Sequence, residues 1–256
     1  MIALTDHDTT GGWDEAIAAR PSGMTIVLGS ELSCTVDVPA LGRRISMHLL
    51  AYGFDPQEQG LAAERLRMRD ARVARVDRWE QMLRDDGYDV SFEPLRRQSE
   101  TGTVGRPHFA SLLVDAGLAP TFEAAFGPDW AGGRYRVPRD GWDVYDAIAK
   151  VRAAGGVPVF AHPYARLRGP VIGAPEIRKM AAAGLGGLEI DHPDQSPDDR
   201  AQLRRLAAEL DLVVTGSSDY HGSRKTQGLG AETTAPAELD RLLAQASGRG
   251  VVTDAA

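Results

Sequence analysis

Five of the six histidines in this sequence lie within or shortly after apolar runs, beside carboxylates and small polar residues. Imidazole nitrogens and carboxylate oxygens are the ligands that Zn, Mn and Fe ions take in proteins. A Gly-Ser-Glu-Leu-Ser segment after a further apolar run adds a glutamate, whose two oxygens could bridge two metals. These residue types predict a metal centre with the candidates His7, Glu31, His48, His162, His192, Asp219 and His221.

Asp219 and His221 are separated by one residue. Because residues i and i+2 point to the same side of a strand, this spacing predicts a two-ligand unit. A single histidine at a strand end is more often a hydrogen-bonded structural residue than a ligand. Five at successive strand ends favour a shared site, with His192 the weakest of them. His108 follows Gly-Arg-Pro and is not at a strand end, so substrate contact and packing at a helix N-terminus both stay open.

Apolar runs alternate with amphipathic helical stretches along most of the chain. The predicted strands are residues 2–4, 25–28, 45–52, 157–160, 187–190 and 212–214, and the predicted helices are 13–20, 144–154, 175–183 and 198–210. This alternation indicates βαβ units and a parallel sheet. In a parallel β/α barrel the carboxyl ends of the strands meet on one face, which would bring the candidate residues together.

Residues 56–137 interrupt the alternation with a mostly helical, arginine-rich region. We interpret it as an inserted helical subdomain, with a long helix ending near Asp86. Its arginines form either a solvated helix face or a basic wall that attracts anionic substrate.

The overall composition limits the classes of protein to consider. With 256 residues, the chain fits one large domain or one domain with an insertion. The net charge of −7 argues against stable binding of long nucleic acid. A single cysteine, Cys34, excludes an intramolecular disulfide and predicts a cytoplasmic protein. No apolar run of membrane length is present, and no phosphate-loop, dinucleotide or nucleophile-elbow motif.

The motifs ALTDHDT, GSELS, HLLAYGFDP, VGRPHFASLLVDAG, YRVPR, AGGVPVFAHP, GLEIDHP and SSDYHG occur in this order over nearly the whole chain. On these motifs the chain resembles the PHP (polymerase and histidinol phosphatase) metal-dependent phosphoesterases. The insertion with GRPH is similar to that of a subgroup which removes the 3′-phosphate of nucleoside 3′,5′-bisphosphates or trims short RNA from its 5′ end.

The resemblance implies an α/β fold, a distorted (β/α)7 TIM-like barrel at 1–55 and 138–256 with the helical insertion at 56–137. It implies up to three divalent metals (Mn, Zn or Fe). The implied ligands are His7, Glu31, His48, His162, Asp219 and His221, of which Asp219 and His221 are also expected to be catalytic. Arg106, His108 and His192 match positions expected to contact substrate phosphate, whereas Asp191 stands where relatives have an aromatic residue.

The family pattern also begins with a strand bearing a His-x-His pair, which is absent before ALTDHDT. We therefore expect a barrel without its first strand, three fewer ligands and fewer metals. A start codon assigned too late and a true truncation both explain this difference, and the first is favoured.

The predicted function is metal-dependent hydrolysis of phosphate esters of nucleotides or short RNA. One alternative is a catalytically impaired barrel that binds a nucleotide or a partner protein, because ligands are absent. Another is a metal-dependent hydrolase of the amidohydrolase type, weakened by the lack of a lysine placed to bridge metals.

Overall fold

The computed structural model describes residues 1–101, 103–138, 141–221, 227–248 and 250–253. The chain divides into two compact units, one formed by Met1–Ala62 with Gly141–Ala256 and the other by Ala63–Asp140. The assignment of a barrel at 1–55 and 138–256 and an insertion at 56–137 stays a prediction.

The first unit is built on a mixed β-sheet whose main path runs β1-β2-β3-β5-β6-β7, with β4 and β8 also pairing with β2. In the described residues its strands are β1 Ile2–Leu4, β2 Ile26–Val38, β3 Arg43–Tyr52, β4 Trp142–Asp143, β5 Val157–Phe160, β6 Gly187–Asp191, β7 Val213–Gly216 and β8 Val251–Val252. All six predicted strands are present. The structure shows an α/β fold, while the closed barrel and the absent first strand stay predictions.

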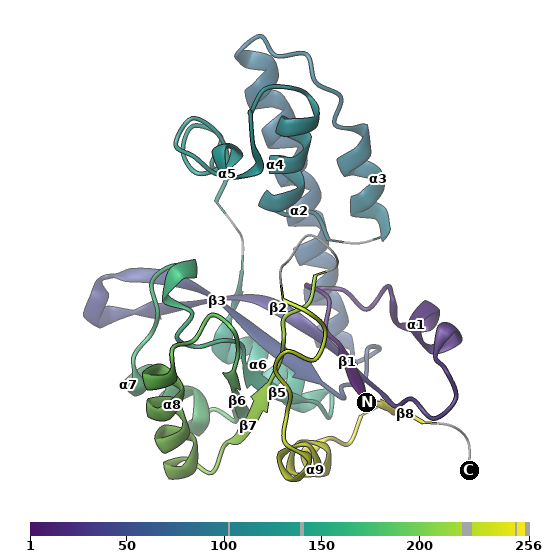
Figure 1. Cartoon of the computed structure of the whole chain (residues 1–256), viewed down its shortest axis with the longest axis vertical. Helices are drawn as coiled ribbons and strands as arrows, with labels where there is room; N and C mark the ends of the chain where they lie inside the picture. Colours follow the sequence, from purple (N-terminus) through teal and green to yellow (C-terminus); the bar gives the residue numbers. More distant parts are fainter. Residues whose placement is uncertain (102, 139–140, 222–226, 249, 254–256) are drawn as a thin grey trace. The chain divides into compact units, whose positions relative to one another are not determined.

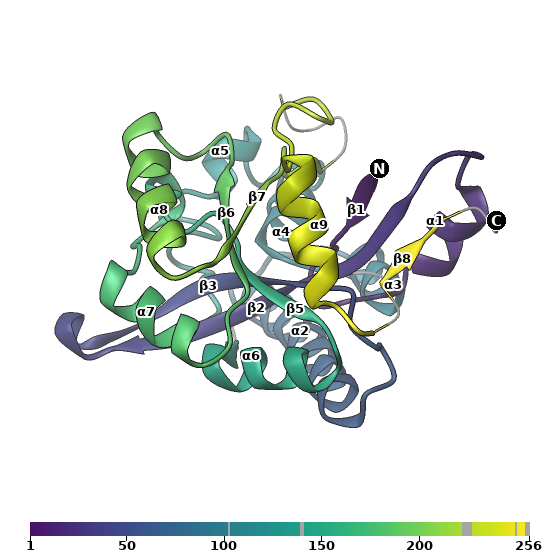
Figure 2. The same ribbon diagram turned by 90° about the horizontal axis from the view of Figure 1, so that it is seen from below.

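The sheet is not purely parallel, and this part of the prediction is wrong. β2 pairs antiparallel with β3, and β3 pairs antiparallel with β5. The second strand was expected to end before Gly-Ser-Glu-Leu-Ser, but it continues to Val38. Its polar side chains are compatible with a buried strand because they find partners, as when the Ser30 hydroxyl donates to the carbonyl of Asp6 at 2.9 Å. The long β2–β3 hairpin projects beyond the other strands (Figures 1 and 2).

Helices lie alongside the parallel strands β5, β6 and β7, as Figure 2 shows. Side-chain caps begin two of them: Asp143 accepts from the backbone N–H groups of Tyr145 and Asp146, and Ser196 accepts from that of Asp199. The α-helices of this unit are α1 Trp13–Ala19, α6 Val144–Ala153, α7 Ala174–Ala182, α8 Pro197–Glu209 and α9 Pro236–Gln245. Between sheet and helices lies an apolar cluster of Val27, Leu50, Tyr52, Val157, Val159, Ala161, Val213 and Leu242.

The second unit is helical. It contains most of α2 Gln59–Asp85, followed by α3 Glu93–Thr101, α4 Arg106–Asp115 and α5 Phe122–Ala125. Its core contains Trp79 stacked on Phe109 at a ring-centroid distance of 4.6 Å, and the Trp79 indole N–H donates to the carbonyl of Tyr135 at 3.0 Å. No helix in the described part of the chain is long and apolar enough to span a bilayer.

Candidate metal centre

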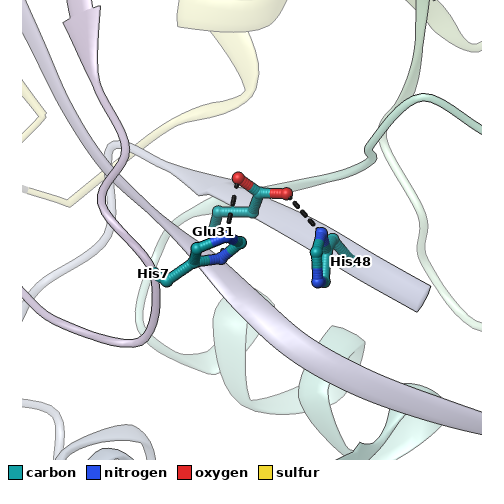
Figure 3. Close-up of side chains that lie close together, drawn as sticks. All are labelled: His7, Glu31 and His48. Atoms are coloured by element: carbon teal, nitrogen blue, oxygen red, sulfur yellow. Dashed lines mark ion pairs between the residues drawn. The ribbon is translucent and has the colours of Figure 1, made fainter. Parts of the chain in front are cut away.

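Glu31 lies at the centre of the candidate site, between two histidines from neighbouring segments of the sheet (Figure 3). Its Oε1 is 2.6 Å from Nδ1 of His48, and its Oε2 is 3.7 Å from Nδ1 of His7. A ligand atom from each of the three residues can be chosen so that all lie within 4.8 Å of one another. This is the donor set of a divalent metal site.

The sheet register explains why these three residues meet. His7 forms a parallel bridge with Glu31, in the same register as the β1–β2 pairs Leu4–Leu28 and Ile2–Ile26. On the other side, Ser33 of β2 is opposite His48 of β3. Because alternate residues share a face, Glu31 and His48 are diagonal neighbours on one side of the sheet.

Four further residues form a closed circuit of side chains together with His7 and His48 of this triad. They are His162, His192, Asp219 and His221. The ring of His7 is 4.7 Å from that of His48, the ring of His48 is 5.5 Å from that of His162, and the ring of His162 is 5.1 Å from that of His192. Nε2 of His192 lies 3.5 Å from Asp219, and Nδ1 of His221 lies 3.2 Å from the same carboxylate. The rings of His221 and His7 are 6.2 Å apart, which closes the circuit. All predicted ligands therefore gather in the first unit.

The pKa shifts of Glu31 and His48 suit a metal ion. Burial works to raise the pKa of Glu31, but the attraction of His7 and His48 and the hydrogen bonds from His162 and His48 outweigh it and hold that pKa well below its usual range. Burial lowers the pKa of His48 to about 4, against the attraction of Glu31. An ionised carboxylate beside a neutral imidazole is the state in which both groups can bind a metal.

Asp219 lies in a loop after β7, and the predicted strand geometry of the Asp219–His221 pair is wrong. The backbone φ of Asp219 is +48°, in the left-handed region. Nδ1 of His221 lies 2.8 Å from the carbonyl of Asp219, so a contact between side chain and backbone holds the pair together. Arg168 donates to the Asp219 carboxylate at 2.6 Å and to Asp194 at 2.6 Å, which supplies Asp219 with a fixed cation.

His192 and Asp191 follow each other in the chain but have different surroundings. The His192 side chain is 1% exposed, and its Nδ1 accepts the backbone N–H of Asp194 at 3.0 Å. This burial favours an orienting contact with Asp219. Asp191 accepts from Arg204 at 2.6 Å, so its carboxylate pairs with α8.

Three buried side chains of this site were not predicted from the sequence. Asp8 accepts the backbone N–H of Ser33 at 2.7 Å, and Glu189 accepts that of His162 at 3.0 Å. Gln195 accepts the backbone N–H of Tyr164 at 2.8 Å. Glu189 lies near the end of an apolar run, as the candidate ligands do, and could have been found from the sequence. Gln195 does not lie at the end of such a run.

Arg106 and His108 belong to the second unit. Arg106 is exposed and is the first residue of α4. Nδ1 of His108 accepts the backbone N–H of Gly105 at 3.1 Å, which caps the helix. The structure thus gives His108 the packing role that was one of its two interpretations, and its contact with substrate stays a prediction.

Comparison with known proteins found no matching family model. A 3′,5′-nucleoside bisphosphate phosphatase of Chromobacterium violaceum is 31% identical over 224 residues, covering 86% of this chain and 76% of the relative. A 5′-3′ exoribonuclease of Haemophilus influenzae is 32% identical over 231 residues, covering 86% of this chain and 79% of the relative. A crystal structure from Bifidobacterium adolescentis, described as a metal-dependent phosphoesterase, matches with a TM-score of 0.84 and 34% identity over 95% of this chain and 85% of that one.

Proposed function

The chain belongs to the PHP family of metal-dependent phosphoesterases, and from this premise we propose that it hydrolyses phosphate esters of nucleotides. It is thus a hydrolase that uses divalent metal, and the alternative of an impaired barrel is not favoured. The substrates we propose are nucleoside 3′,5′-bisphosphates, or short RNA taken from its 5′ end. The observation that supports this most is the circuit formed by five histidines and Asp219, three of whose histidines contact Glu31.

His7, Glu31 and His48 would hold one divalent ion, and the nearby His162, Asp219 and His221 would offer donor atoms for a further ion. Mn, Zn and Fe all suit imidazole and carboxylate donors. Such an ion neutralises charge on phosphoryl oxygens and lowers the pKa of water. In the hydrolysis, a water oxygen bonds to phosphorus and gives up one proton, the ester P–O bond breaks, and the leaving oxygen takes up one proton.

The remaining side chains orient these groups and move the proton. If Nδ1 of His221 donates to the Asp219 carbonyl at 2.8 Å, the neutral ring has its lone pair on Nε2. The His221 side chain is 45% exposed, so its ring is accessible to ligand or proton. Arg168 and His192 hold the Asp219 carboxylate in place. Arg106, exposed at the start of α4, would bind a substrate phosphate through its guanidinium fork.

The test is a substrate profile measured by phosphate release and by RNA gel with added Mn²⁺. Adenosine 3′,5′-bisphosphate and a 5′-phosphorylated oligoribonucleotide are compared with adenosine 3′-monophosphate and an amide substrate. We expect turnover of one or both of the first two. Turnover of the amide alone, or of no phosphate ester by metal-loaded protein, would contradict the proposal.

A further inference from the structure

The backbone of His162 is held in an uncommon conformation. Its φ is +32°, in the left-handed region that non-glycine residues seldom adopt. Such a conformation persists where surrounding contacts enforce it. From this position the imidazole of His162 contacts the triad, with its Nε2 at 3.4 Å from Oε1 of Glu31.

The strand pairing that would hold His162 ends just before it. β5 and β6 pair in parallel through Val159–Gly187 and Phe160–Leu188, and β5 ends at Phe160. Beyond that point the two side chains Glu189 and Gln195 replace the backbone ladder. Glu189 Oε2 accepts the N–H of His162 at 3.0 Å, and Gln195 Oε1 accepts the N–H of Tyr164 at 2.8 Å.

The two acceptors are themselves fixed. Each is 3% exposed. The amide nitrogen of Gln195 donates to the carbonyls of Glu189 and Ile190 at 3.1 and 2.7 Å. Because buried hydrogen bonds of this kind are directional, Glu189 in β6 and Gln195 in the loop after it determine where the loop after β5 runs.

We propose that Glu189 and Gln195 are positioning residues that keep the His162 imidazole in place for metal binding. Neither is proposed as a ligand. The inference rests on the proposed function only in taking His162 as a ligand. Groups that support metal ligands typically change metal affinity by about 10- to 100-fold when removed.

The experiment measures Mn²⁺ affinity by electron paramagnetic resonance titration, together with kcat and KM for a phosphate ester. Glu189→Leu removes the acceptor, whereas Glu189→Gln keeps an amide oxygen that can accept the same N–H. We expect Glu189→Leu to weaken Mn²⁺ binding and lower kcat by about tenfold or more, with KM changed less. Glu189→Gln should recover most of the loss.

Glu176→Leu is the matched control, because Glu176 is a buried carboxylate of the same unit that pairs with Lys179 on α7. Gln195→Leu is a second variant should Glu189→Leu fail to fold. Wild-type Mn²⁺ affinity in folded Glu189→Leu or Gln195→Leu would overturn the proposal. If His162→Ala also bound Mn²⁺ as the wild type does, the ligand assignment itself would fail, which separates the two claims.

Discussion

Nδ1 of His48 lies 2.6 Å from Oε1 of Glu31, across the antiparallel pair of β2 and β3. The same glutamate meets His7 on the opposite side of β2. One central strand with a carboxylate and two flanking segments with imidazoles are enough to assemble a triad on one sheet face.

Replacing the Glu31 carboxylate by an amide tests this triad. Glu31→Gln keeps the shape of the side chain and removes the negative charge that two imidazoles share. We expect Mn²⁺ affinity, measured by calorimetric titration, to fall by more than about tenfold, because a ligand should matter at least as much as a group that supports one. Asp37→Asn, an exposed change on the same strand, should leave the affinity unchanged. Equal affinities in both variants would speak against the triad.

The Arg106 guanidinium is expected to act on substrate binding alone. Arg106→Ala should raise KM for a nucleotide substrate by about tenfold or more, since a charge-assisted hydrogen bond contributes about 1.5–3 kcal/mol. Mn²⁺ affinity should not change. Arg97→Ala is the control, because Arg97 is exposed on α3 and pairs only modestly with Glu93 one helical turn away. An unchanged KM in Arg106→Ala would remove this residue from the phosphate site.

His108 should affect stability through its cap on α4. His108→Ala removes the acceptor for the Gly105 N–H and is expected to lower the free energy of unfolding by about 1 kcal/mol. Urea denaturation followed by circular dichroism measures the change, and Mn²⁺ affinity should stay at the wild-type value. A variant as stable as the wild type would show that the cap contributes little.

The second unit has an acid-sensitive ion pair. Arg134 and Tyr135 donate to Asp86 and lower its pKa to about 2. A carboxylate with a lowered folded-state pKa stabilises the fold above its unfolded pKa, and this stabilisation is lost as pH falls toward about 2. We therefore expect Asp86→Asn to lower the melting temperature at pH 7 and the difference from wild type to shrink by pH 3. Asp85→Asn, next to it in the chain, serves as the control, and a difference that does not depend on pH would contradict the assignment.

The candidate metal ligands and their place at strand ends could be predicted from the sequence, but not all of the geometry that brings them together. Histidines at strand ends were recognisable because runs of apolar residues mark the strands in the sequence. The course of β2 was missed, since Ser30 and Glu31 indicate a loop unless their buried partners are known. The left-handed backbone of Asp219 was missed for a related reason, because tertiary contacts such as the one with Arg168 select that conformation. Gln195 was missed because it accepts a backbone N–H group, which leaves no trace in the spacing of residues, whereas Glu189 lies near a strand end and could have been found.

The most direct test combines metal content and turnover on one sample of the 256-residue chain. Elemental analysis after dialysis against Mn²⁺ gives the ions bound per chain, and phosphate release from adenosine 3′,5′-bisphosphate is assayed on the same protein. We predict at least one tightly bound ion together with turnover, both lost in Glu31→Gln. Folded wild-type protein that binds no Mn²⁺, Zn²⁺ or Fe²⁺ and releases no phosphate would contradict the account.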